Sequence, residues 1–202
     1  MTPLELTTVG ALLEQVASKS PTPGGGAVAA LVGALGAALG GMVVSYSLGK
    51  KSLAAHQGLL DDAGRRLIAM RESCARLADA DAQAYDRLNT LQRLAPDDPQ
   101  RAMQYAQAVA DAIDVPMRLA STCEDALGVL RTLAGTSNPH LKSDLAIAGV
   151  LVLAGAEAAR WNVVINLREV GQDHRREEMR ARVDGIVARA AQIKADLDRQ
   201  CA

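Results

Sequence analysis

The 202-residue sequence predicts an all-α protein, a single bundle of long helices. Aromatic residues make up 2% of the chain and Phe is absent, so the core must be built from Leu, Val, Ile, Met and Ala. These residues suit packed helices better than β-sandwiches or barrels. Apolar residues recur at three- and four-residue steps, and no window shows sustained alternation. No long linker interrupts the chain, so residues 1–202 are expected to form one domain.

The first two predicted helices flank a glycine-rich turn. Apolar residues at helical spacing predict a helix from Leu6 to Val16, and Ser18–Gly26, with two prolines and three glycines, cannot continue it. Ala27–Val44 has eighteen residues without a charge, which is long enough to span a membrane. Ten of the eighteen are Ala or Gly, whereas insertion is favoured by Leu, Ile, Phe and Val. A helix buried on every side is therefore expected, with a membrane span as the alternative.

Four longer helices follow. A 3-4 repeat predicts one helix from Leu53 to about Leu94, which Pro96–Pro99 ends. A helical run from Arg101 to about Ala134 contains Pro116, which is expected to kink or divide it. After the loop Gly135–Pro139, two further helices are expected, and their ranges are Leu141–Gly171 and Gln172–Gln200.

Charge and targeting signals favour a cytoplasmic protein. The 22 basic and 23 acidic side chains leave a net charge of -1, which argues against an electrostatic grip on nucleic acid. The segment Met1–Ser20 carries Glu5 and Glu14 and lacks the basic start and apolar run of a signal peptide. Reduced thiols in the cytoplasm are the expectation.

Cysteine and histidine positions predict neither a disulfide framework nor a metal site. The three cysteines are far apart and form no Cys-x-x-Cys pair, and the three histidines lie in separate segments without a Glu-x-x-His pattern. These residues are Cys74, Cys123 and Cys201, and His56, His140 and His174.

Polar residues at core positions mark the candidate site. Asp81 occupies a position where the repeat otherwise supplies Leu, Met or Cys, so it either pairs with an Arg, turns to solvent, or points into a cavity. In the Leu141–Gly171 helix, Asp144, Asn162 and Asn166 lie on one face. Buried amides need partners, which are other helices or a ligand. Ser143 or Asp144 can also cap the helix, although Asn138 or Ser137 can fill that role.

The glycine turn offers backbone donors to a ligand. Gly24–Ala29 matches G-x-G-x-x-A by letter, but no strand precedes it and the next acidic residue is Asp61, so a dinucleotide fold is not expected. Glycines at a helix N-terminus still present N–H groups to an anion or a polar ligand edge. At the other end of this helix, Lys50 and Lys51 suit the negative end of the helix dipole.

Several of these segments, in order along nearly the whole chain, resemble the cyclodeaminase/cyclohydrolase family of folate enzymes. One departure is Ala27, where the family often has Ser, so any role of that hydroxyl is absent. The segments that carry the resemblance are Pro21-Thr22-Pro23-Gly24-Gly25-Gly26-Ala27-Val28-Ala29-Ala30, Gly49-Lys50-Lys51, Asp81-Ala82-Gln83-Ala84-Tyr85, Val115-Pro116, Asn138-Pro139-His140-Leu141-Lys142-Ser143-Asp144 and Asn162-Val163-Val164-Ile165-Asn166-Leu167.

The resemblance implies an all-α, single up-and-down bundle of long helices that forms homodimers and acts on a tetrahydrofolate derivative. Its members are cyclodeaminases, often fused behind a formiminotransferase domain, or stand-alone methenyltetrahydrofolate cyclohydrolases. Because this sequence shows no formiminotransferase part, we expect hydrolysis of 5,10-methenyltetrahydrofolate to 10-formyltetrahydrofolate. A cyclodeaminase that releases ammonia and a non-catalytic folate-binding bundle are the alternatives. No metal or nucleotide cofactor is expected, because the reacting carbon is already activated.

The resemblance and the chemistry together suggest roles for the candidate residues. A carboxylate near the bridging carbon would stabilise the amidinium-type cation and accept a proton from the attacking water. Enclosure in the bundle could raise that carboxyl's pKa towards neutrality. The expected catalytic residues are Asp144, as base or electrostatic partner, and Asp81, which shares that role or bonds the pterin edge. The expected substrate-binding residues are Gly24, Gly25 and Gly26 for a folate carbonyl or carboxylate, Lys50 or Lys51 for the glutamate tail, and Asn138, Ser143, Asn162 and Asn166 for water, pterin or the helix pair.

Overall fold

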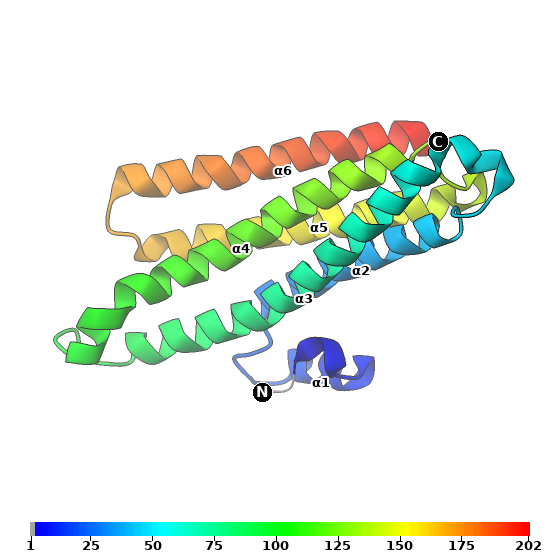
Figure 1. The fold of residues 1–202 in the computed structure, drawn as a ribbon. Coiled ribbons are helices and arrows are strands. Elements are labelled where there is room, and N and C mark those ends of the chain that lie inside the picture. The colour runs from blue at the N-terminus through cyan, green and yellow to red at the C-terminus, as the bar shows by residue number, and fades with distance from the viewer. Residues whose placement is uncertain (1–2) are drawn as a thin grey trace.

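A computed structural model describes residues 3–202, so the first two residues of the predicted domain lie outside it. In the described part the chain forms α-helices joined by short 3-10 turns, labelled η (Figure 1). In order, the elements are η1 (Leu4–Leu6), α1 (Val9–Ala17), α2 (Gly25–Ser45), η2 (Lys51–His56), α3 (Gln57–Gln92), α4 (Pro99–Leu133), η3 (Pro139–Leu141), α5 (Lys142–Asn166), η4 (Leu167–Glu169) and α6 (Asp173–Cys201).

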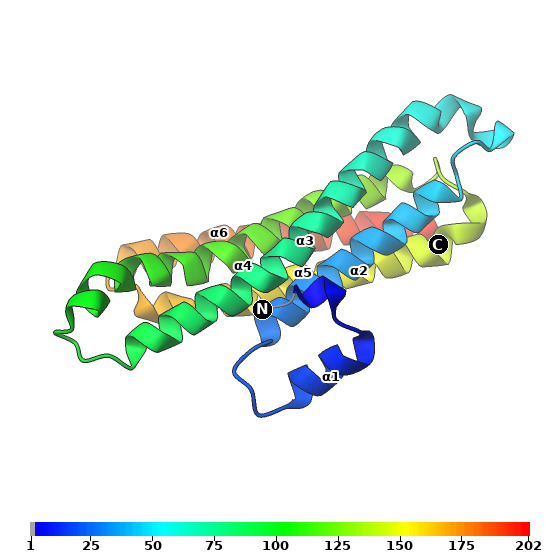
Figure 2. The same cartoon turned by 60° about the horizontal axis from the view of Figure 1, so that its bottom comes forward.

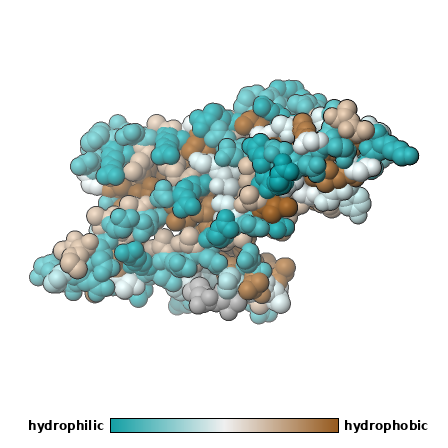
Figure 3. Space-filling model, viewed as in Figure 1, coloured by the Kyte–Doolittle hydropathy of each residue, from teal (hydrophilic) through white to brown (hydrophobic). Residues whose placement is uncertain are grey.

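The long helices make an elongated up-and-down bundle, which confirms the predicted fold class. Helix α2 packs against α3 and α5, α4 packs against the same two helices, and α6 covers α4 and α5. Helix α1 stands away from this body beside α2 (Figures 1 and 2). The face on which α3, α4 and α6 lie is mostly hydrophilic (Figure 3).

Small residues let α2 and α5 approach closely and fix their direction. A Cβ on Gly36 would lie 2.6 Å from Val152 Cγ2 and 2.9 Å from the Ala148 carbonyl oxygen. A Cβ on Gly155 would lie 3.2 Å from the Ala29 carbonyl oxygen. Early residues of α5 therefore meet the later half of α2, and later residues of α5 meet its beginning, so the two helices are antiparallel. The helix of small residues was expected to be buried on every side, but only the sides that pack on its neighbours are buried, and Leu35 is exposed.

Several helix boundaries differ from the sequence prediction. The helix predicted from Leu6 starts at Val9, and the one predicted to reach Gly171 ends at Asn166. The helix predicted from Leu53 starts at Gln57, because η2 precedes it and Leu53 has a non-helical φ of -114° and ψ of 19°. Pro116 lies inside α4 and does not divide it. A proline has no N–H for the carbonyl four residues earlier, which here is Ala112. The Asn166 side-chain amide donates to that Ala112 oxygen at 2.7 Å, so the carbonyl keeps a partner.

Two helical stretches of the described chain, Gly25–Ser45 and Pro139–Glu169, are long and apolar enough to cross a membrane by length and composition. Half of the apolar window in the first, and 39% of that in the second, is buried inside the bundle. Core helices meet the same criterion, so this is weak evidence for a membrane span. Several other apolar residues of these helices are exposed, among them Leu35, Ile147 and Val150.

Candidate active site

The carboxylate of Asp81 lies directly on the glycine turn that begins α2. Asp81 is on α3, and a Cβ added to Gly26 would lie 2.1 Å from its Oδ1 and 2.3 Å from its Cγ. The carboxylate accepts a hydrogen bond from the Ala27 backbone N–H. The N-cap residue Gly24 has no side chain to cap the helix, so a carboxylate from α3 partners one of its free N–H groups. Among the described residues Asp81 forms no ion pair with an Arg, and its half-buried carboxylate lies against the glycine turn without lining either cavity described below.

Burial raises the pKa of Asp81, because desolvation disfavours the charged form, and the Ala27 N–H opposes this by stabilising the carboxylate. The positive end of the α2 dipole acts in the same direction as the N–H group. A carboxyl group with a raised pKa beside a backbone N–H donor suits proton transfer. This is the chemistry expected of a general base or of a partner for a cation.

The two predicted asparagines bond to backbone carbonyls of the bundle. Asn162 donates to the Ala158 oxygen of its own helix at 3.2 Å, and Asn166 donates to Ala112 on α4. Asn162 is seven residues beyond Gly155, which contacts Ala29, so the antiparallel course of α5 puts Asn162 near the level of the glycine turn. The sequence left open whether these amides bond to another helix or to a ligand. In the structure Asn166 bonds to another helix.

The remaining predicted residues gather at the opposite end of α2. There the Ser47 hydroxyl, which is fully buried, accepts from the Asn138 backbone N–H at 2.8 Å and ties this end of α2 to the loop before α5. The Asn138 side chain caps η3 by accepting from the His140 N–H at 3.2 Å. Ser143 and Asp144 are therefore not needed as caps. Asp144 lies half-buried in the first turn of α5.

Lys50 and Lys51 lie at the same end of the bundle as Asn138. Lys50 is half-buried and precedes η2, and Lys51 is exposed as its first residue. Both follow the turn that leaves α2, in which Gly49 has a φ of 74°. That left-handed conformation is readily adopted by glycine.

Within one chain, the predicted site residues other than Asn166, which bonds to α4, thus form two groups. The glycine-turn group contains Gly24, Gly25, Gly26, Asp81 and Asn162. The distal group contains Lys50, Lys51, Asn138, Ser143 and Asp144. Ten residues of α2 separate Gly26 from Gly36, and four of α5 separate Ala148 from Asp144, so the two carboxylates are about 20 Å apart along the bundle. One chain does not bring Asp81 and Asp144 to a common substrate.

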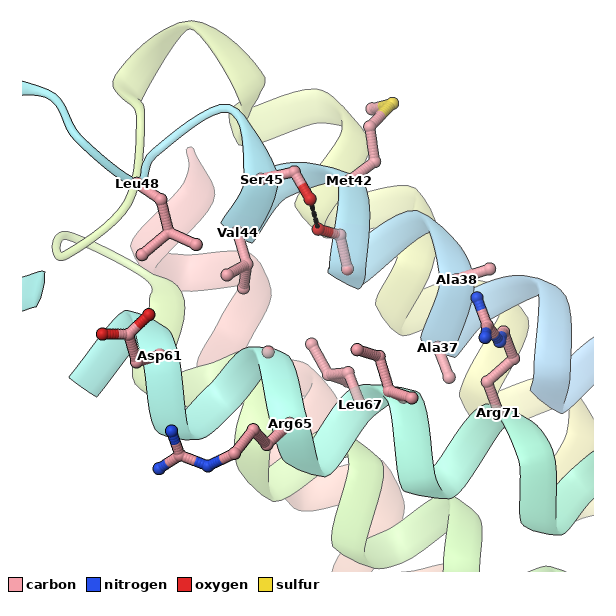
Figure 4. Close-up of a pocket in the computed structure, with 13 residues that line it drawn as sticks. Ala37, Ala38, Met42, Val44, Ser45, Leu48, Asp61, Arg65, Leu67 and Arg71 are labelled. Atoms are coloured by element: carbon pink, nitrogen blue, oxygen red, sulfur yellow. Dashed lines mark hydrogen bonds between the residues drawn. The ribbon is translucent and has the colours of Figure 1, made fainter. Parts of the chain in front are cut away.

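The structure also shows a cavity that the sequence did not predict. It has a volume of about 500 Å³ and lies between α2 and α3, where Figure 4 shows Asp61, Arg65 and Arg71 along its α3 side. Its other wall is apolar and includes Ala37 and Met42. A second cavity of about 280 Å³ is lined by Asn138, Lys142 and Cys201, among others. The spacing of apolar residues does not predict either cavity, because each depends on how separate segments pack against one another.

Two of the cysteines meet in the core. A Cβ on Gly33 would lie 3.1 Å from the Cys123 Sγ and 3.4 Å from the Cys74 Sγ, and both residues are buried thiols. The hydrogen bond between them lowers the pKa of Cys74 and raises that of Cys123, which burial raises further. Among residues 3–202, no cluster of three His, Cys, Asp or Glu side chains has the arrangement of a metal site.

The fold and site together define a helical-bundle protein with a carboxylate-based candidate active site. The formiminotransferase-cyclodeaminase family model matches residues 8–185. A formimidoyltransferase-cyclodeaminase from Sus scrofa is 34% identical over 93% of this chain, and a methenyltetrahydrofolate cyclohydrolase from Methylorubrum extorquens is 28% identical over 92% of this chain and 91% of its own. The structure of a formiminotetrahydrofolate cyclodeaminase from Thermotoga maritima superposes with a TM-score of 0.89 at 26% identity, over 97% of this chain and 96% of that one.

The chain belongs to the formiminotransferase-cyclodeaminase family, a family of folate-processing enzymes. It spans about a third of the length of the mammalian relatives, 36% for the Sus scrofa protein. The resemblance to this family that the sequence segments indicated is therefore confirmed.

Proposed function

We propose that this protein is a methenyltetrahydrofolate cyclohydrolase, which adds water to 5,10-methenyltetrahydrofolate and yields 10-formyltetrahydrofolate. The observation that carries the proposal is the partly desolvated Asp81 carboxylate on the glycine turn of α2. The near full-length match to a relative named for this reaction supports it. Formiminotetrahydrofolate cyclodeaminase is the second candidate, favoured by the Thermotoga maritima structure.

The proposed reaction uses Asp81 as the base. The substrate's bridging carbon carries the delocalised positive charge of an amidinium, which a nearby carboxylate stabilises. Water attacks this carbon while the carboxylate accepts one of its protons, and the resulting adduct breaks its bond to N5, which takes up a proton. The formyl group remains on N10. The balance is one water added and one proton released, so the proposed reaction calls for no metal or nucleotide cofactor. The cytoplasm is the proposed compartment.

A homodimer would unite the two groups of site residues. If two copies pack with their α2 helices antiparallel, the glycine-turn group of one copy lies near the distal group of the other. Asp144 would then stabilise the cation or share the base role, and Lys50 or Lys51 would hold the glutamate tail. The N–H groups of Gly24, Gly25 and Gly26 that Asp81 leaves free would bind a carbonyl or carboxylate of the folate, with Asn138, Ser143, Asn162 and Asn166 around them.

The outward face of α2 and α5 supports this dimer. We define it by the exposed or half-exposed residues Val28, Val32, Leu35, Ala38 and Met42 on α2, and Ile147, Val150, Leu151 and Ala154 on α5. The α2 part of the face carries no charged residue between Gly25 and Ser45. Leu35 is 61% exposed and Val150 is 53% exposed. An uncharged apolar face of this extent is typical of a protein interface.

The activity is tested by the absorbance decay of 5,10-methenyltetrahydrofolate in a buffer that hydrolyses it slowly. We expect acceleration by the wild-type protein and a loss of at least about 100-fold in Asp81→Asn, as for removal of a general base. Acceleration that survives in this variant would remove Asp81 from the mechanism. Ammonia released from formiminotetrahydrofolate, without hydrolysis of the methenyl substrate, would instead establish the cyclodeaminase. Inactivity towards both folates would leave a binding protein.

The shared site is tested by mixing two inactive variants. Asp81→Asn and Asp144→Asn chains are unfolded together, refolded, and compared with each variant refolded alone. A mixed dimer then contains one site with both carboxylates, so random pairing is expected to restore roughly one quarter of the wild-type activity. If mixing restores no activity while both variants are dimeric, the two carboxylates do not act across the interface.

A further inference from the structure

Helix α1 has an apolar side that its own chain covers only in part. Val9, Leu12, Leu13 and Val16 recur at i, i+3, i+4 and i+7, which places them on one side of the helix. None of the nine residues of α1 is buried, and Val9 and Leu13 are 72% and 63% exposed. Figure 2 shows α1 apart from the bundle, next to α2. Leu12 packs against the core of its own chain, whereas Val9, Leu13 and Val16 stay exposed in the single chain.

Packing is needed to keep α1 helical. The Thr8 side chain caps its first turn by accepting from the Ala11 N–H at 3.3 Å, which is a modest contribution. Isolated helices shorter than about 12 to 15 residues are marginal in water, so a nine-residue helix depends on tertiary contacts. The segment before it is anchored, since Leu4 is buried and its N–H donates to Asp79 Oδ1 at 3.0 Å. The anchor and the start of α2 hold α1 beside the outward face.

The outward face of α2 and α5 is a second exposed apolar surface, which a partner would bury. Two adjacent helices, each about 10 Å wide and some 30 Å long, present roughly 600 Å². A stable protein interface buries about 800 Å² on each partner, so this face alone is somewhat small. The apolar side of α1 lies beside it in the same chain and adds to the area. A second copy would cover both surfaces at once under two-fold symmetry.

We propose that α1 is an exchanged arm, whose apolar side packs against the margin of the outward α2 and α5 face of a second copy. This inference rests on the homodimer of the proposed function and does not depend on which folate is the substrate. The second copy binds the arm through apolar contacts to Val9, Leu13 and Val16. The arm thereby extends the interface beyond the bundle.

The test replaces Leu13 with the photocrosslinker p-benzoylphenylalanine in the full chain. Light and ¹⁵N-labelled chains are unfolded together, refolded and irradiated, and sedimentation gives the oligomeric state of the same sample. We expect crosslinked peptides from α2 or α5 that combine one light and one heavy partner. The same replacement at Met103, which is 77% exposed on α4, is the control and should give no such crosslink.

Other outcomes overturn the proposal. Crosslinks only between peptides of like isotope, in a dimeric sample, would show that α1 folds back on its own chain, and a dimer without α1 crosslinks would show that the arm is free. A monomer would remove the dimer as well. Crosslinks to lipid in phosphatidylcholine–phosphatidylglycerol vesicles, in place of protein, would assign the apolar side to a membrane surface. As a second measurement, Leu13→Glu is expected to weaken dimerisation at least about tenfold, whereas Met103→Glu should leave it unchanged.

Discussion

The contact between Gly26 and Asp81 shows how a single missing side chain creates the candidate site. The carboxylate occupies the volume that a Cβ at residue 26 would fill, so its position depends on that glycine. Burial raises the pKa of Asp81, and the Ala27 N–H restrains the rise. Backbone shape and carboxylate chemistry are therefore linked at this point, and each can be altered separately.

Gly26→Ala is expected to displace Asp81 and to lower kcat at least about 100-fold, the loss expected when a general base is misplaced. The new methyl group would lie 2.1 Å from Oδ1, and α2 cannot withdraw because it is packed on α3 and α5. Steady-state kinetics of methenyltetrahydrofolate hydrolysis measures the effect. Gly128→Ala on α4, where a Cβ meets no atom within 4 Å, is the control and should gain about 0.5 to 1 kcal/mol of stability. Normal kcat in Gly26→Ala would mean that the carboxylate position is not critical.

Asp81→Asn is expected to make the stability of the protein less dependent on pH. The folded-state pKa of Asp81 is raised, so its contribution to stability is present below the unfolded-state pKa and is lost as pH rises through the folded-state value. The amide cannot ionise and still offers an oxygen to the Ala27 N–H. Urea unfolding at several pH values should show the variant gaining on the wild type as pH increases over that window. A difference that is constant with pH would contradict the raised pKa.

At the scale of helices, one hydrogen bond explains two residues that break the helical pattern, the proline Pro116 and the polar Asn166. Pro116 removes the partner of the Ala112 carbonyl, and Asn166 from α5 supplies another at 2.7 Å. The neighbouring helix therefore supports the continuity of α4 through Pro116. The sequence predicts both irregularities, but it does not show that they face each other.

A double-mutant cycle tests this link. Asn166→Ala is expected to destabilise the protein by about 1 to 3 kcal/mol, because it leaves a buried carbonyl without a partner. In the Pro116→Ala background the restored N–H bonds Ala112, so the same change should cost about 0.5 kcal/mol or less. Chemical denaturation of the four proteins gives both values. Equal costs in the two backgrounds would show that Asn166 stabilises the bundle by another route.

The 3-4 spacing of apolar residues predicted α3, and the uncharged run Ala27–Val44 predicted α2, with prolines or glycines marking the breaks between helices. The start of α3 was misplaced because the apolar repeat continues through Leu53, where the backbone forms a 3-10 turn. The meeting of Cys74 and Cys123 was not predictable, because it depends on the register of α3 against α4. Asp81 and the glycine turn were each identified from their own irregularity, and only the packing of α2 on α3 shows that they form one site.

For the whole molecule, the main consequence of the fold is the separation of the two predicted catalytic carboxylates. Sequence reasoning treats all polar positions as candidates for one site, because a sequence does not give distances along a bundle. The antiparallel course of α2 and α5 puts Asp144 about 20 Å from Asp81 in the same chain. An uncharged outward face between the two groups makes association of two copies the direct way to bring them together.

Leu35→Glu is expected to separate the two copies and to abolish activity together with dimerisation. The side chain is 61% exposed on the outward face of the single chain, so glutamate can be accommodated in the monomer, but a dimer would bury its charge. Sedimentation should show a monomer with unchanged helix content, and the specific activity of the wild type should fall on dilution through its dissociation constant. Met103→Glu, at an exposed position on α4, is the control and should leave both properties intact. A fully active monomer of Leu35→Glu would show that a single chain holds the complete site, and Asp144 would then have no part in it.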